Sequence, residues 1–314
     1  MRIQDASKYE ILYDLPAGQI DQKAVGSIRT KTIRAGDSLE IEAFPMVAIP
    51  DGAKREKRRR QTGKAQAALN LKNTRKRVRR LLEANFSEQD IALHLTFDYG
   101  VIDRAQSNLE DVRSELEAAG YPMDDEDARR ILRNFIKRVR RLIAKRGGKG
   151  SDLKYLYVIE TTREPELDDT NALPARYHYH MVLSGQPGDL TIKDMQGLWQ
   201  YGYTKAEPLD MRFNGLAGLA AYITKQRRCV KRWAHSQNLR EPTERISHRK
   251  ISRGKAAKIA RDVQGSGREI LEKLYPGYGL EECEVRYSDF VAGAYIYARL
   301  RKRKDKKAGG GKRR

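Results

Sequence analysis

Residues 91–97 alternate strictly between apolar and polar side chains, which predicts a β-strand with one buried face. The spacing of apolar residues becomes helical over 126–145, before two further strands at 155–161 and 177–183. The loop between these two strands most simply joins them as an antiparallel pair. Three shorter elements follow: a helix near 193–199, a strand near 203–209 and a helix over about 216–228. This order predicts an α+β fold in which helices pack on one face of an antiparallel sheet and the open face carries the function.

The chain is strongly basic. It has 63 Lys and Arg residues against 42 Asp and Glu residues, so its 314 residues carry a net charge of +21. Such a charge indicates a polyanionic partner, most often nucleic acid. We expect contacts to the phosphate backbone from two basic segments, namely Lys57, Arg58, Arg59, Arg60, Arg227, Arg228, Lys231 and Arg232.

Several classes of protein do not fit this sequence. No apolar stretch approaches the ~18–20 residues that a membrane span needs, and the N-terminus lacks the apolar core of a signal peptide. Two cysteines are too few for a disulfide framework. Gly254-Lys255 lacks the other residues of a phosphate-binding loop, so no nucleotide cofactor is expected. We therefore expect a cytoplasmic protein with no membrane partner.

Two histidines stand on the strand at 177–183. Because side chains alternate across a strand, His178 and His180 point to one face, where two imidazoles can ligate one divalent ion. Two ordinary sheet histidines are the alternative interpretation. Glu160 ends the preceding strand and can reach the same ion if the two strands pair; otherwise it is a solvated strand end. Two imidazoles and a carboxylate suit Mg²⁺ or Mn²⁺ beside a nucleic acid, while His94 on the polar face of 91–97 is expected to be structural.

The helix expected at 216–228 carries a candidate nucleophile. Tyr222 and Lys225 are three residues apart, so they project from the same side of a helix. A phenol with a pKa near ~10 attacks a phosphate poorly unless a metal or a cation stabilises the charge, and Lys225 would supply a cation. A half-buried helix tyrosine without a catalytic role is the alternative.

These motifs, in this order, resemble those of the HUH rolling-circle replication initiators. The resemblance covers roughly residues 65 to 300, and its main motifs are His94-Leu95-Thr96-Phe97, His178-Tyr179-His180 and Tyr222-x-x-Lys225. Shorter similarities lie in Asn85-Phe86, Leu198-Trp199-Gln200-Tyr201-Gly202, the segment 235–242 and Tyr275-Pro276-Gly277-Tyr278. Initiators with two catalytic tyrosines place the second four residues on, where this chain has Gln226, so a single-tyrosine enzyme is expected.

The resemblance implies an HUH palm, similar to an RRM or ferredoxin-like sheet, as a domain at 64–240 with its leading helix. Around it we expect a basic N-terminal extension at 1–63 with a short strand and a linker, a helical accessory region at 241–298, and a basic disordered tail at 299–314. Metal ligation falls to His178, His180 and Glu160.

The resemblance also implies a reaction. Tyr222 would cleave single-stranded DNA at a replication origin through a 5′-phosphotyrosine intermediate, with Lys225 at the phosphate and Mg²⁺ or Mn²⁺ as cofactor. The expected partners are the helicase and polymerase of a bacterial host.

Two other interpretations stay open. An HUH transposase or mobilisation relaxase would keep the chemistry and change the biology. A non-catalytic basic DNA-binding protein would account for the charge at residues 1–90 and 245–314, where no catalytic group is evident.

Overall fold

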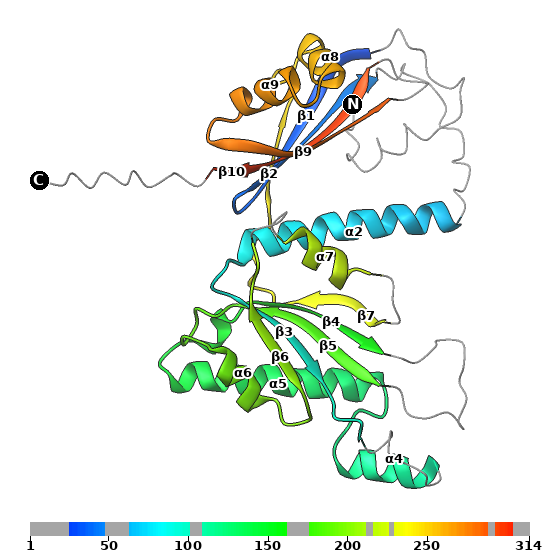
Figure 1. The fold of residues 1–314 in the computed structure, drawn as a ribbon, viewed down its shortest axis with the longest axis vertical. Coiled ribbons are helices and arrows are strands. Elements are labelled where there is room, and N and C mark those ends of the chain that lie inside the picture. Colours follow the sequence, from blue (N-terminus) through cyan, green and yellow to red (C-terminus); the bar gives the residue numbers. More distant parts are fainter. Residues whose placement is uncertain are drawn as a thin grey trace, which may run out of the picture. The chain divides into compact units, whose positions relative to one another are not determined.

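The computed structural model describes residues 25–47, 63–100, 109–161, 176–211, 216–225, 229–287 and 293–303. They form two compact units, each with its own five-stranded antiparallel sheet (Figure 1). One unit is Ala67–Arg240, and the other combines the described parts of 1–66 and 241–314. No helix in these described ranges is long and apolar enough to cross a membrane.

The sheet of the unit Ala67–Arg240 has the strand order β6-β3-β5-β4-β7, so strands distant in sequence lie side by side. Its strands are β3 (Ile91–Thr96), β4 (Tyr155–Thr161), β5 (Tyr177–Leu183), β6 (Thr204–Pro208) and β7 (Cys229–His235). The antiparallel α+β architecture expected from the sequence is confirmed, and the pairing of β4 with β5 is antiparallel as predicted. The sequence did not predict β7, which pairs with β4.

One face of this sheet is buried by the long helix α5 (Asp125–Lys145), as Figure 1 shows. Asp124 caps α5 by accepting a hydrogen bond from the backbone N–H of Asp127, and three acidic residues in the first turn match the positive end of the helix dipole. The helices α4 (Leu109–Ala118) and α6 (Ile192–Leu198) each add one buried residue to the same core, Leu116 and Met195. The amphipathic spacing in the sequence thus becomes the main core of the unit.

Helices also cover part of the other face, where the sequence predicted an open surface. The C-terminal half of α2 (Gly63–Asn85) and the short α7 (Ala217–Ile223) pack there on apolar residues of β4 and β5. The apolar strand residues in this second core are Leu156, Val158 and Val182. The rest of this face, toward the ends of β4 and β5 that carry the histidines, holds polar side chains.

α7 is shorter than the predicted helix at 216–228. It ends at Ile223, and the cap residue Thr224 turns its hydroxyl back to donate a 2.7 Å hydrogen bond to the carbonyl of Ala220. The chain must leave the helix here because Cys229 already pairs with Glu160 in the sheet. Helical spacing alone does not include this demand from β7.

The second unit corrects the domain outline drawn from the sequence. Its sheet has the order β8-β1-β2-β10-β9, formed by β1 (Val25–Ala35), β2 (Ser38–Val47), β8 (Thr243–Ser247), β9 (Tyr278–Tyr287) and β10 (Ala294–Lys302). The N-terminal hairpin therefore pairs on both sides with strands from the C-terminal region.

Two expectations about the C-terminal region were wrong. The region 241–298 contains strands as well as the helices α8 (Arg253–Arg261) and α9 (Ser266–Leu274), which pack on one face of this sheet. Residues 299–302, expected in a disordered tail, belong to β10, because Leu300 is buried in the core and pairs with Leu39 and Leu280. The predicted strand at 39–47 is confirmed as β2.

Candidate metal and nucleophile site

The register of the first sheet gathers the predicted site residues. Glu160 of β4 lies opposite His178 of β5, and His180 lies opposite His94 of β3. Side chains two residues apart on a strand share a face, so all four point to the same side of the sheet. They lie on the side opposite α5, whose core takes Tyr177 and Tyr179 from the alternate positions of β5.

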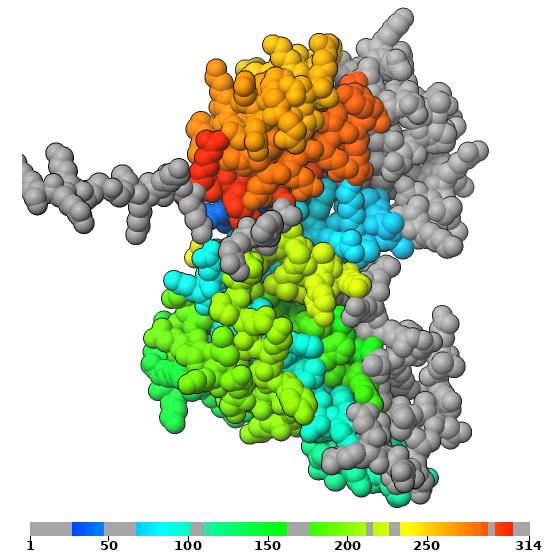
Figure 2. Space-filling model, in the orientation of Figure 1, coloured from blue at the N-terminus to red at the C-terminus, as the bar shows by residue number. Residues whose placement is uncertain are grey.

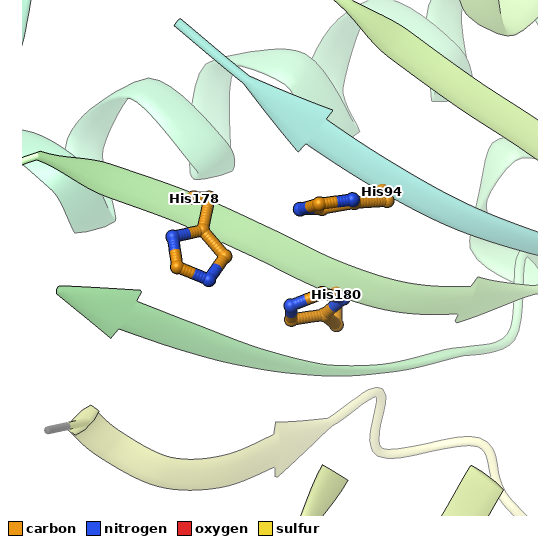
Figure 3. Close-up of side chains that lie close together, drawn as sticks. All are labelled: His94, His178 and His180. Atoms are coloured by element: carbon orange, nitrogen blue, oxygen red, sulfur yellow. The ribbon is translucent and has the colours of Figure 1, made fainter. Parts of the chain in front are cut away.

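Three imidazoles meet on this face (Figure 3). One ring nitrogen from each of His94, His178 and His180 lies within 4.8 Å of the others, which allows one metal ion to be held by all three. The rings of His94 and His180 are stacked with centroids 4.2 Å apart, and His178 lies edge-on to both.

Glu160 connects two of the histidines. Its Oε2 lies 2.8 Å from Nε2 of His178 and 3.6 Å from Nε2 of His180, and the residue is only 2% exposed. Burial by itself would raise the pKa of Glu160, but the hydrogen bonds and positive charges of the two histidines outweigh burial and hold its pKa well below the usual range. The carboxylate is therefore ionised and placed either to ligate an ion or to orient the two imidazoles.

His94 is the site residue that sequence reasoning undervalued. Its Nε2 is buried and has no hydrogen-bond partner among the described residues, a costly state that a metal ion would relieve. Burial, followed by the charges of His180 and His178, lowers the pKa of His94 to about 4, so its imidazole is neutral at neutral pH. Metal ions bind the neutral form of imidazole, and the donor set therefore fits a divalent ion. The signal in the sequence was the polar position of His94 within an alternating strand.

Tyr222 reaches the histidine cluster from α7. Its hydroxyl lies 3.2 Å from Nε2 of His180, and its ring lies edge-on to that imidazole with centroids 4.7 Å apart. Buried Ala220 and Ile223 attach α7 to the sheet while Tyr222 stays 40% exposed. A phenol beside the candidate metal ligands and open to solvent can meet a phosphate that enters from outside.

Lys225 is placed differently from the sequence prediction. It lies two residues beyond the end of α7 and is exposed, so the argument from residues three apart on one helix does not hold for it. The basic residues expected at 57–60 and 227–228 lie outside the described residues, as does Gln226. Lys231 and Arg232 belong to the backbone of β7.

A comparison with protein families agrees with this site. Residues 118–227 match the model of a family described as replication-associated protein ORF2. This confirms the predicted resemblance to rolling-circle replication initiators, and the histidine cluster is compatible with their HUH motif. No curated protein and no solved structure matches the chain.

The matched segment contains Glu160, His178, His180 and Tyr222, whereas His94 precedes it. The match therefore defines a class, replication-associated proteins of initiator type, and supports a role in DNA replication with binding at an origin. His94 joins the site through the pairing of β3 with β5.

Proposed function

We propose that this protein is a site-specific endonuclease that nicks and reseals single-stranded DNA, and that it initiates rolling-circle replication through a 5′-phosphotyrosine intermediate. One observation carries the proposal: the hydroxyl of Tyr222 lies 3.2 Å from a histidine of a three-imidazole cluster. The family match of the segment that carries both supports it.

His94, His178 and His180 would hold a divalent ion, with Glu160 as a further ligand or as the carboxylate that orients the imidazoles. Such an ion would act as a Lewis acid that polarises the scissile phosphate. Three imidazoles favour Mn²⁺ over Mg²⁺, because Mg²⁺ prefers oxygen ligands.

The reaction exchanges one ester bond for another. The Tyr222 oxygen forms a bond to phosphorus while the bond from phosphorus to the 3′ oxygen breaks. The phenol loses its proton to solvent and the departing 3′ oxygen gains one. Because the phosphodiester energy is kept in the tyrosyl ester, the reverse reaction reseals DNA without ATP. The free 3′-OH would prime a host polymerase, and a host helicase would unwind the duplex.

Lys225 and the basic residues named from the sequence would act on the phosphate backbone. Lys225 lies close to Tyr222 in the chain, since its N–H donates a hydrogen bond to the Tyr222 carbonyl. Its ammonium would offset charge on the phosphate, while Lys57–Arg60 and the segment 227–232 would hold DNA without reading its sequence.

The nucleophile is tested by trapping the intermediate. The full chain is incubated with a labelled single-stranded origin library and Mn²⁺, and adducts are separated under denaturing conditions and sequenced. Tyr222→Phe should abolish the adduct while DNA binding stays the same, since only a hydroxyl is lost. Tyr201→Phe is the matched control, because Tyr201 packs with the core on the other face of the sheet. An adduct that survives in Tyr222→Phe refutes the assignment.

The ligand set is tested by calorimetry with Mn²⁺. His94→Ala, His178→Ala and His180→Ala should each weaken binding by at least ~10-fold. Glu160→Gln keeps the size of the side chain, so comparable Mn²⁺ affinity would make Glu160 an orienting group and a large loss would make it a ligand. Unchanged affinity in His178→Ala and His180→Ala contradicts the metal site.

The biological role is tested by the position of the trapped nick. A nick at a replication origin supports initiation of replication, whereas a nick at a transposon end or a transfer origin supports the transposase or relaxase alternative. A complete absence of adducts, with tight DNA binding, favours the non-catalytic alternative.

A further inference from the structure

We propose that Tyr203 and Lys205, beside and on the edge strand β6, form a subsite that binds the nucleotide carrying the leaving 3′ oxygen. This inference rests on the proposed function and assigns residues to one side of the scissile phosphate. Tyr203 would stack on the base, and Lys205 would contact a backbone phosphate.

The sheet register places both residues beside the histidines. Lys205 pairs with His94, and Tyr203 continues the same register by one residue, opposite Thr96. Thr96 in turn lies opposite His178 on β5. Since side chains alternate, Tyr203 and Lys205 face the same side of the sheet as the imidazoles.

Tyr203 is an exposed aromatic ring on a fixed backbone. It is 70% exposed, whereas Tyr177 and Tyr179 are nearly fully buried. Its carbonyl accepts hydrogen bonds from the backbone N–H of Thr96 at 2.9 Å and from the Thr96 hydroxyl at 3.3 Å. An open ring held this way offers a base a stacking surface at little cost in conformational entropy. Figure 2 shows the yellow-green segment that includes β6 at the surface of the unit Ala67–Arg240.

Lys205 supplies a positive charge next to the candidate metal ligands. It is close enough to His94 for its charge to disfavour protonation of that imidazole. Its ammonium lies 3.0 Å from a carboxylate oxygen of Glu207, and both side chains are largely exposed. A solvent-exposed ion pair of this kind is weak, so a DNA phosphate can replace the carboxylate.

The position of Tyr222 decides which nucleotide this subsite takes. Tyr222 comes from α7, which packs over β4 and β5, and β6 lies at the opposite edge of the sheet beyond β3. In an in-line displacement, the attacking and leaving oxygens stand on opposite sides of phosphorus. With Tyr222 attacking from the β4 side, the 3′ oxygen leaves toward β6, where Tyr203 and Lys205 lie.

The stacking residue is tested by equilibrium binding of the full chain to a fluorescent single-stranded oligonucleotide. Tyr203→Ala should weaken binding by about 5- to 150-fold, and Tyr203→Phe should stay within about 2-fold of the wild type because the ring is kept. Tyr287→Ala is the matched control, since Tyr287 is 66% exposed in the other unit. Equal affinity of Tyr203→Ala and the wild type overturns the stacking role.

The phosphate contact and the polarity need separate readouts. Lys205→Met should reduce the slope of log affinity against log salt by about 0.7, the value for one contact on a single strand. With the nick mapped, 2-aminopurine placed just 5′ of the scissile phosphate should be quenched in Tyr222→Phe and not in the double variant with Tyr203→Ala. Quenching on the 3′ side instead overturns the polarity.

The binding assays do not depend on cleavage. Tyr203-dependent binding by a protein that forms no adduct refutes the nuclease proposal and leaves the stacking surface. An active nuclease whose binding ignores Tyr203 refutes the subsite alone.

Discussion

Gly202, which precedes β6, is the position where a single methyl group should do the most damage. Its φ is +152°, and a Cβ built there would lie 2.3 Å from the N of Asp98, 2.7 Å from the carbonyl carbon of Phe97 and 2.8 Å from the carbonyl oxygen of Thr96. All three are backbone atoms, so no side chain can rotate away. We predict that Gly202→Ala forces β6 and the end of β3 apart.

The magnitude follows from two hydrogen bonds that draw the chain together on either side of Gly202. Thr96 donates its N–H to the carbonyl of Tyr203, and Asp98 donates to the carbonyl of Tyr201, each at 2.9 Å. Backbone strain at a non-glycine residue in such a conformation costs about 1–3 kcal/mol. Loss of one of the two hydrogen bonds adds about 1 kcal/mol, so the expected loss of unfolding free energy is about 2–4 kcal/mol.

Tryptophan fluorescence during urea unfolding measures this loss. Both tryptophans of the chain, Trp199 and Trp233, lie in the unit Ala67–Arg240, so the signal follows that unit alone. Gly197→Ala is the control: Gly197 lies in α6 with nothing within 4 Å of a built Cβ, so this change should add about 0.5–1 kcal/mol. A Gly202→Ala variant within about 0.5 kcal/mol of the wild type would refute the reasoning.

Three further predictions test other parts of the structure. The buried Tyr179 hydroxyl donates a 2.9 Å hydrogen bond to the carbonyl of Ala128, so Tyr179→Phe should cost about 1–3 kcal/mol in the same urea assay; an unchanged midpoint would contradict it. Burial raises the pKa of the Cys283 thiol to about 11 from 9.0, so alkylation at about pH 8 should be about 100-fold slower than for an ordinary thiol, as followed by mass spectrometry of labelled peptides. Labelling at the ordinary rate would show that Cys283 is accessible. Hydrogen bonds from Arg146 lower the pKa of Asp194 below its ordinary value of 3.8, so this pair stabilises the fold above that pH and the contribution is lost as pH falls through the lowered pKa. The stability difference between wild type and Arg146→Met should therefore shrink in acid, and a difference that grows would refute this sign.

The sequence by itself determined the elements whose periodicity is local. Alternation and helical spacing placed β4 and β5 at their observed bounds, and α5 within one residue of its start. The same alternation put His178 and His180 on one face, because the direction of a side chain along a strand depends only on the strand itself. The order of the short motifs was enough to indicate a replication initiator, which the family match supports.

Only the tertiary structure decided which distant segments meet. His94 joins the cluster because β3 pairs with β5 in a register that sets it opposite His180, and nothing near His94 in the sequence specifies that partner. α7 ends early because β7 must reach β4, and β10 claims residues 299–302 because an N-terminal hairpin offers them a partner strand. Periodicity is fixed by neighbours along the chain, whereas strand pairing is fixed by the burial and hydrogen bonding of segments far apart in it.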